Sequence, residues 1–190
     1  MPTVKQEFSL AHLTVLGCPP PEMTYIAARA GYDYVSIRPI YMGLPGEPNY
    51  ALAEKRELLR QTKAALKSTG VRLHDIELAR IFDGVDVRSY LPAMQDAAEL
   101  GGRAVLSSIW GGERDYYIEK FAELCDLAQP LGLLGAYLGT DLGRPLDEVT
   151  REIDDGRDLV GFETGHTDLR GLRATPEEPA AGDLLRRSDD

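Results

Sequence analysis

The sequence predicts an α/β protein of about six βα units, with parallel strands arranged as an incomplete TIM (β/α) barrel. Short apolar segments alternate along the chain with segments of helical spacing. Parallel strands require such crossover connections between them. A complete barrel of eight units takes about 250 residues, whereas this chain has 190. An open flavodoxin-like sheet with a ligand at a switch point also fits the alternation.

The predicted strands are short, apolar segments that end at Gly, Pro or a polar residue. Three consecutive prolines follow Cys18 and close the first segment, because proline cannot continue a strand ladder. Glycines make the fifth segment the weakest of the set. The predicted strands are residues 8–17, 32–37, 71–78, 103–109, 132–138 and 159–163.

The segments between these strands have the periodicity of amphipathic helices. Glycines follow several of them, as expected at helix ends. The predicted helices are residues 22–30, 51–68, 91–100, 116–127 and 145–153, and residues 39–50 form a Pro- and Gly-rich loop. We expect residues 1–172 to form the barrel domain and the charged, Pro- and Ala-rich residues 173–190 to form a flexible tail.

The composition and motif content argue against several classes of function. The net charge of −10 argues against nucleic acid as a partner, and no apolar run reaches the roughly 20 residues of a membrane span. Cys18 and Cys125 are far apart and form no CxxC motif, which predicts unpaired thiols and a cytoplasmic location. No phosphate-binding glycine motif or GxSxG motif occurs, so nucleotide binding and hydrolase chemistry lose support.

Barrel enzymes place their sites at the carboxyl ends of strands, where Arg38 and Trp110 are expected, while His12 lies inside the first predicted strand. His12 either faces the pocket or is a core histidine bonded to a carbonyl group. Arg38 could bind a substrate oxygen or form a surface ion pair. Trp110 could cover a sugar ring or simply close the barrel mouth.

The strongest local cluster is His74-Asp75-Ile76-Glu77. Strand periodicity predicts Asp75 and Glu77 on one face and His74 with Ile76 on the other. Burial would raise the pKa of at least one carboxyl group, giving a general base, or the pair would supply oxygen ligands for a divalent cation. We expect a functional role for Glu77, and we count His74 among the substrate-binding candidates. The alternative is a solvated edge strand.

A second donor set follows the last predicted strand, where Glu163, His166 and Asp168 occur close together. Mixed oxygen and nitrogen donors suit Mn, Zn, Co or Fe better than Ca. A closed metal site needs three or four ligands from different strands.

Successive segments between residues 8 and 133 also carry a family resemblance. They are FSLAHLTVLG, AARAGYDYVSIRPI, KSTGVRLHDIEL, AAELGGRAVLSS and FAELCDLAQPLGL. In this order they resemble the units of the sugar phosphate isomerase/epimerase family, the xylose isomerase-like TIM barrels. Further on, DLVGFETGHTDLRG resembles the family's sixth-strand motif, with Glu163 where an Asp is common.

The resemblance implies a divalent metal, Mn, Co, Zn or Mg, and proton transfer between adjacent carbons of a small sugar or polyol. It assigns Glu163 as a metal ligand. With the residue patterns above, it gives Glu77 and His166 as catalytic residues and His12, Arg38, His74 and Trp110 as substrate-binding residues.

The chain departs from the family at several ligand positions. Residues 135–139 provide no carboxylate where the fifth strand of relatives ends with a metal-binding Glu, and the ligands of the seventh and eighth strands have no counterpart. A truncated, inactive barrel that binds a small molecule or a partner is therefore the alternative function. The two open sheet edges could be covered by the tail or by a second copy in a homodimer, or could leave a marginally stable remnant.

Overall fold

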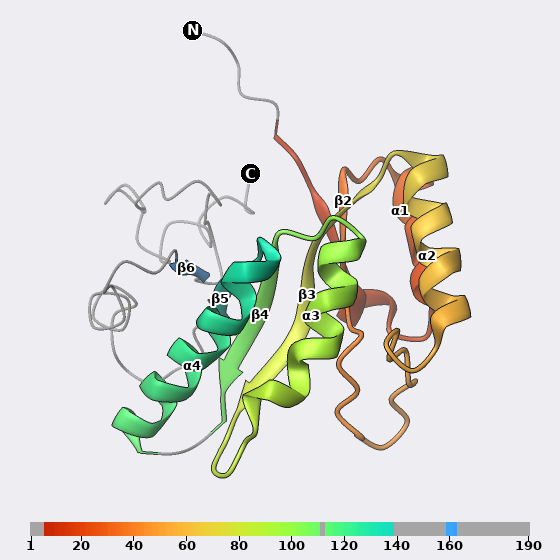
Figure 1. Cartoon of the computed structure of the whole chain (residues 1–190). Helices are drawn as coiled ribbons and strands as arrows, with labels where there is room; N and C mark the ends of the chain where they lie inside the picture. Colours follow the sequence, from red (N-terminus) through yellow and green to blue (C-terminus); the bar gives the residue numbers. More distant parts are fainter. Residues whose placement is uncertain (1–5, 111–112, 139–158, 163–190) are drawn as a thin grey trace, which may run out of the picture.

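A computed structural model describes residues 6–110, 113–138 and 159–162. Its sheet has six strands in the order of the chain (Figure 1), and every neighbouring pair is parallel. The strands are β1 (Ser9–Ala11), β2 (Tyr34–Ile37), β3 (Arg72–Ile81), β4 (Ala104–Ile109), β5 (Leu134–Leu138) and β6 (Leu159–Phe162). This sequential order is that of a barrel sector and differs from the reversing order of a flavodoxin-like sheet. The predicted partial barrel is therefore confirmed.

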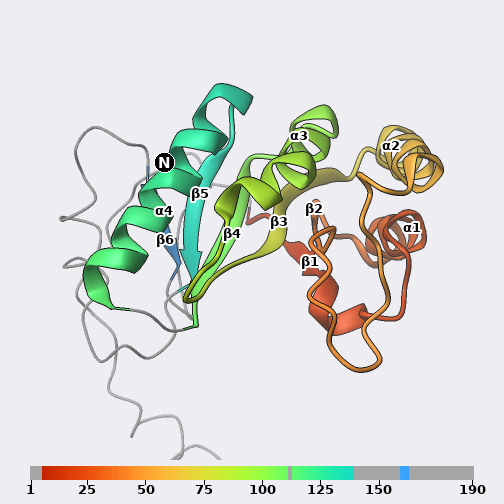
Figure 2. The same cartoon turned by 60° about the horizontal axis from the view of Figure 1, so that its bottom comes forward.

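Within the described residues, four α-helices connect β1 to β5 and lie on the same side of the curved sheet (Figure 2). They are α1 (Pro20–Ala30), α2 (Arg56–Thr69), α3 (Leu91–Glu99) and α4 (Arg114–Ala128), with short 3₁₀ helices η1 (His12–Val15), η2 (Val87–Tyr90) and η3 (Gln129–Leu131). None of the helices in the described ranges is long and apolar enough to cross a membrane. The predicted helix 145–153 and the tail 173–190 lie outside the described residues.

The main hydrophobic core lies between the sheet and these helices. Strand residues that point outward from the barrel axis, such as Val35, Ile37 and Val105, are fully buried there. Helix residues such as Met23 and Leu124 belong to the same cluster. Burying apolar surface on this side leaves the opposite, inner face of the sheet for polar side chains.

The first predicted strand was too long. β1 ends at Ala11, and His12 begins η1. The Thr14 hydroxyl donates to the Ala11 carbonyl at 2.7 Å, and the backbone N–H of Cys18 donates to the Val15 carbonyl at 2.8 Å. These local hydrogen bonds give the backbone a turn in place of a strand ladder, a competition that hydrophobicity alone does not reveal.

β3 contains two register irregularities. Leu73 and Ile76 pair with Val35 and Ile37, so three steps along β3 match two along β2. On the other side, Ile76 and Ala79 pair with Val105 and Ser107, so three steps along β3 again match two along β4. Each irregularity breaks the alternation of faces, as a β-bulge does. The peptide bond from Glu77 to Leu78, within the second irregularity, is cis.

These bulges overturn one expectation. Ile76 lies in the hydrophobic core, but His74 does not share its face. The His74 ring instead contacts the Asp75 carboxylate, with Nδ1 2.6 Å from Oδ2, and packs edge-on against the Tyr34 ring. The inner face of the sheet therefore receives His74, Asp75 and Glu77 together.

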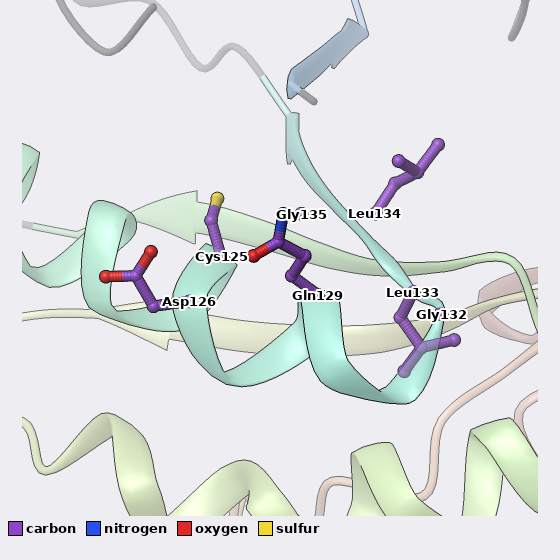
Figure 3. Close-up of a pocket in the computed structure, with 7 residues that line it drawn as sticks. All are labelled: Cys125, Asp126, Gln129, Gly132, Leu133, Leu134 and Gly135. Atoms are coloured by element: carbon purple, nitrogen blue, oxygen red, sulfur yellow. The ribbon is translucent and has the colours of Figure 1, made fainter. Parts of the chain in front are cut away.

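A glycine explains the close packing of α4 on β5. A Cβ atom on Gly135 would lie 2.4 Å from the Sγ atom of Cys125, so only glycine fits without a shift of this side chain. Figure 3 shows the two residues beside a small pocket of about 160 Å³. Cys125 is buried and forms no disulfide with Cys18.

Candidate functional site

The polar inner face ends in a cleft at the carboxyl ends of the strands. The cleft has a volume of about 340 Å³. Its walls are mostly apolar and come from η1, the loop after β2, β3 and the residue that follows β4. The lining residues include Leu13, Arg38, Met42, Glu47, Leu78 and Trp110. A concave apolar site with a few polar groups is typical of small-molecule binding.

Glu77 is the buried carboxyl group beside this cleft. The residue is 9% exposed, and its Oε2 atom lies 3.9 Å from the Arg38 Nη1 atom. Burial, and to a smaller extent repulsion from Asp75, raise the pKa of Glu77 to about 7, although Arg38 opposes the rise. A carboxyl group with a pKa near neutral can both accept and return a proton.

Arg38 follows β2 and is only 8% exposed. Its Nη2 atom lies 3.6 Å from the Glu47 Oε1 atom and 3.5 Å from the Met42 sulfur. Its Nε atom is buried and has no hydrogen-bond partner among the described residues. Unlike the surface pair that was one possibility, Arg38 is a buried cation with one donor still available.

Asp75 lies deeper on the inner face. Its Oδ2 atom accepts hydrogen bonds from the Ser36 hydroxyl at 3.0 Å and from His74 Nδ1 at 2.6 Å. The Ser36 hydroxyl is also 2.9 Å from the Ser9 hydroxyl. This chain of contacts links β1, β2 and β3, and it fixes the negative charge that acts on Glu77.

Both ring nitrogens of the fully buried His12 have backbone partners. The Arg38 N–H donates to Nδ1 at 3.0 Å. Nε2 is therefore the protonated nitrogen, and it donates to the Cys18 carbonyl at 2.8 Å. Burial lowers the pKa of His12, although the Cys18 hydrogen bond opposes this. The ring stacks on Tyr50, so His12 holds η1 and the start of the Arg38 loop together, while substrate binding by His12 stays a prediction.

Trp110 stands at the cleft rim and is 57% exposed. Its indole N–H donates to the Ser108 hydroxyl at 2.6 Å, which fixes the ring orientation. The guanidinium of Arg80 lies 5.3 Å from the indole ring centre. An exposed indole held in this way offers a flat surface for the C–H face of a sugar.

The other sequence-predicted site residues are not described. Glu163, His166 and Asp168 lie outside the described residues. Within the described ranges, no group of three or more His, Cys, Asp or Glu side chains is arranged to hold a metal ion. The positively charged neighbour of Glu77 is the Arg38 guanidinium, whose Nη1 atom lies 3.9 Å from Oε2.

Sequence reasoning missed Glu47 and Arg80. Glu47 lies in the predicted loop, and its Oε2 atom accepts the backbone N–H groups of Met42 and Leu44. Arg80 lies on the same inner face as Asp75 because the second irregularity of β3, between Ile76 and Ala79, separates the two residues. The placement of Arg80 has no clear sequence signal, whereas a loop carboxylate surrounded by glycines is a recognisable candidate for capping backbone donors.

Comparisons with known proteins support the fold. No family model and no curated protein matches the sequence. A xylose isomerase domain containing protein from Salmonella typhimurium LT2 matches with a TM-score of 0.62 and 15% identity, over 84% of this chain and 61% of that protein. D-psicose 3-epimerase, solved in the presence of D-fructose, matches with a TM-score of 0.60 and 9% identity, over 82% and 62%.

The IolI protein, solved with a bound zinc atom, matches with a TM-score of 0.55 and 18% identity, over 70% of this chain and 51% of that protein. The chain thus spans less than two thirds of each of these three structures. The likeness shows that the chain has the fold of the xylose isomerase-like TIM barrels, as its sequence segments implied.

Proposed function

We propose that this protein is a sugar isomerase or epimerase-type protein that transfers a proton on a small sugar or polyol. The observation that carries the proposal is Glu77, a buried carboxyl group with a pKa of about 7 next to an arginine and a solvent-open cleft. Perturbed carboxyl groups of this kind gather at functional sites. The solved structures with this fold include a ketose epimerase.

In the proposed step, the Glu77 carboxylate removes a proton from the carbon next to a sugar carbonyl. The electron pair of that C–H bond forms a carbon–carbon double bond, and the carbonyl oxygen becomes negatively charged. Arg38, beside Glu77 at 3.9 Å, supplies the positive charge that stabilises this oxygen. The protonated Glu77 then gives the proton to the former carbonyl carbon, the hydroxyl proton of the adjacent carbon passes to the negatively charged oxygen, and the new carbonyl forms at the carbon that lost its hydrogen.

Other inner-face residues have supporting roles in the proposal. Trp110 covers the sugar ring, and Asp75 helps to keep the Glu77 pKa high. His74 is held against Asp75 and is proposed to contact a substrate hydroxyl. His12 shapes the loop that presents Arg38, and His166 is proposed as a second catalytic group.

A divalent cation, Mn, Co, Zn or Mg, is proposed at Glu163. One protein with this fold holds zinc, and such an ion supplies Lewis-acid stabilisation when bound. Calorimetric titration of metal-stripped protein with Mn²⁺ and Co²⁺ tests this part. Binding that disappears in Glu163→Ala is the expected result, and the absence of binding to the wild-type protein would contradict it.

The proton-transfer proposal is tested by following deuterium from D₂O into the C–H bonds next to the carbonyl of candidate ketoses, using proton NMR. We expect exchange with the wild-type protein and a loss of at least about 100-fold in Glu77→Gln, as for removal of a general base. Glu54→Gln is the matched control, because Glu54 is an exposed carboxylate. Equal exchange in both variants would exclude Glu77 as the base.

The second candidate function is a non-catalytic barrel that binds a small molecule or a partner. The lack of a carboxylate at residues 135–139, where the family resemblance implies a metal-binding Glu, favours it. In that case a sugar ligand would perturb the fluorescence of Trp110, the single tryptophan of the chain, while no deuterium exchange would be catalysed.

A further inference from the structure

Arg80 is a cation at the cleft that the proposed proton transfer does not use. Its Nη2 atom lies 3.4 Å from the Met42 carbonyl oxygen, and its guanidinium stacks near the rings of Phe82 and Trp110. Both Met42 and Trp110 line the cleft. Among the residues that the structure describes, Arg80 has no carboxylate partner. A guanidinium held by a carbonyl group and two rings keeps its full charge available to a ligand.

Arg38 approaches the same place from β2. Its Nη2 atom contacts the sulfur of Met42, the residue whose carbonyl oxygen holds Arg80. The buried Nε atom of Arg38 lacks a hydrogen-bond partner within the described ranges. A buried donor without a partner is costly, and a ligand oxygen would satisfy it.

Among the described residues, Arg38 has carboxylates within 4 Å, whereas Arg80 has no carboxylate contact. Glu47 is held by the N–H groups of Met42 and Leu44 and offsets one of the two guanidinium groups. The raised pKa of Glu77 leaves this carboxyl group partly protonated near neutral pH, so that it offsets the charge of Arg38 only in part. A cleft with this balance, in a chain of net charge −10, favours a ligand that carries a single negative charge.

We propose that the ligand of this cleft is a sugar acid, whose carboxylate binds between Arg80 and Arg38 and whose carbon skeleton packs on Leu78 and Trp110. This inference rests on the proposed function for the polyol part of the ligand and adds its charge. The apolar walls accept the C–H face of the skeleton, while the planar guanidinium fork matches a carboxylate.

A phosphate ester offers the same oxygen chemistry with a larger charge. The carboxylates of Glu47 and Glu77 lie 3.6 Å and 3.9 Å from Arg38, so a dianion would meet repulsion that a monoanion meets only in part. The charge balance therefore favours a carboxylate over a phosphate.

Calorimetric titrations with D-glucose, D-glucuronate and D-glucose 6-phosphate test this inference, because the three share one ring. We expect D-glucuronate to bind at least about tenfold more tightly than D-glucose and more tightly than the phosphate ester. Arg80→Gln is expected to remove the preference, and Arg80→Lys to retain part of it. Arg88→Gln is the matched control, because Arg88 is an exposed arginine paired with Glu123.

The salt dependence of binding to the wild-type protein tests the same inference and does not depend on whether a variant folds. Raising NaCl from about 50 to 500 mM should weaken D-glucuronate binding and leave D-glucose binding unchanged, because screening acts only on the charged ligand. Equal affinity for D-glucose and D-glucuronate would overturn the inference, and so would a preference for the phosphate ester. Deuterium exchange without a D-glucuronate preference would leave the proposed function standing and overturn this inference. A D-glucuronate preference without exchange for any sugar would support this inference and contradict the proposed function.

Discussion

At the scale of single residues, Glu77 makes the stability of the protein depend on pH. Its pKa is about 7 in the folded protein, against an ordinary value of 4.5, and burial is the main cause. The folded state therefore holds the Glu77 proton more tightly than the unfolded state. The resulting stability is fully present below pH 4.5 and is lost as the pH rises through about 7.

Replacing this carboxyl group with an amide should relieve the cost of the buried charge. We expect Glu77→Gln to increase the free energy of unfolding at pH 8 by up to about 3 kcal/mol and to change it little at pH 4. Urea unfolding at both pH values checks this. Glu54→Gln, at an exposed position, should show no such pH-dependent gain, and an equal gain in both variants would count against the assignment.

The residue scale also shows how far the sequence leads. Burial of Arg38 and Glu77 beside one cleft follows from the expectation that polar groups gather at the carboxyl ends of barrel strands. The hydrogen-bond partners of His12 could not be predicted in this way, because the Cys18 carbonyl and the Arg38 N–H come together only when η1 forms. The unsatisfied Nε atom of Arg38 likewise depends on packing that no local pattern encodes.

At the scale of elements, the contact of α4 with β5 is set by one glycine. Gly135→Ala should place a methyl group 2.4 Å from Cys125 Sγ, and overpacking of this kind costs about 1 to 3 kcal/mol. In the double variant Gly135→Ala with Cys125→Ala, part of this loss should be recovered, because the sulfur is gone. Thermal unfolding of the single and double variants measures the coupling.

Gly17→Ala is the matched control for this cycle, because a Cβ atom at Gly17 would meet nothing within 4 Å. A loss in Gly135→Ala that the second substitution does not reduce would show that the strand backbone, rather than Cys125, demands glycine. The weak strand signal of residues 132–138 thus has a packing origin.

Helices α2 and α3 are joined by a charged cluster. The Arg56 guanidinium donates to the buried Asp96 carboxylate at 2.7 Å and reaches Glu99 at 3.4 Å. Burial raises the pKa of Asp96, although Arg56 opposes the rise. Lys63 contacts Glu99 at 3.0 Å, where both side chains are well exposed.

Arg56→Met should therefore destabilise the protein more than Lys63→Met. The first substitution leaves the Asp96 carboxylate buried without its cation, while the second removes an exposed ion pair of little worth. The midpoints of urea unfolding at pH 7 compare the two. A larger loss in Lys63→Met would contradict this account of the α2–α3 contact.

The sequence pattern predicts only some features of β3. Its position and its neighbours were predicted, because apolar residues of a parallel strand are buried by helices on one side. The face of His74 was not, because the first bulge shifts the alternation by one residue, and Arg80 lies beyond the predicted strand, which ended at Leu78. Bulges depend on the pairing of three strands and leave no mark on local hydrophobicity.

At the scale of the whole molecule, β1 stands at one end of the strand order within the described ranges. Phe8, next to this strand, is 57% exposed, and Leu13 is 62% exposed. An exposed parallel edge with apolar neighbours is a site where a second copy could associate. A homodimer through this edge stays a prediction.

Sedimentation velocity at increasing protein concentration tests this expectation. We predict a concentration-dependent shift toward a dimer, which Phe8→Glu should suppress by introducing charge at the edge. Tyr25→Glu, on α1 and also exposed, should leave the association unchanged. A strictly monomeric wild-type protein at high concentration would contradict the prediction.

The sequential strand order has a consequence for how the fold arises. Among the described residues, each strand from β1 to β6 pairs with the strands before and after it in the chain and with no other. A growing polypeptide can therefore add one strand and its helix at a time to an edge that already exists, without waiting for a distant partner. Such local connectivity lowers the contact order, and it suits assembly of the sheet from its N-terminal end during synthesis on the ribosome.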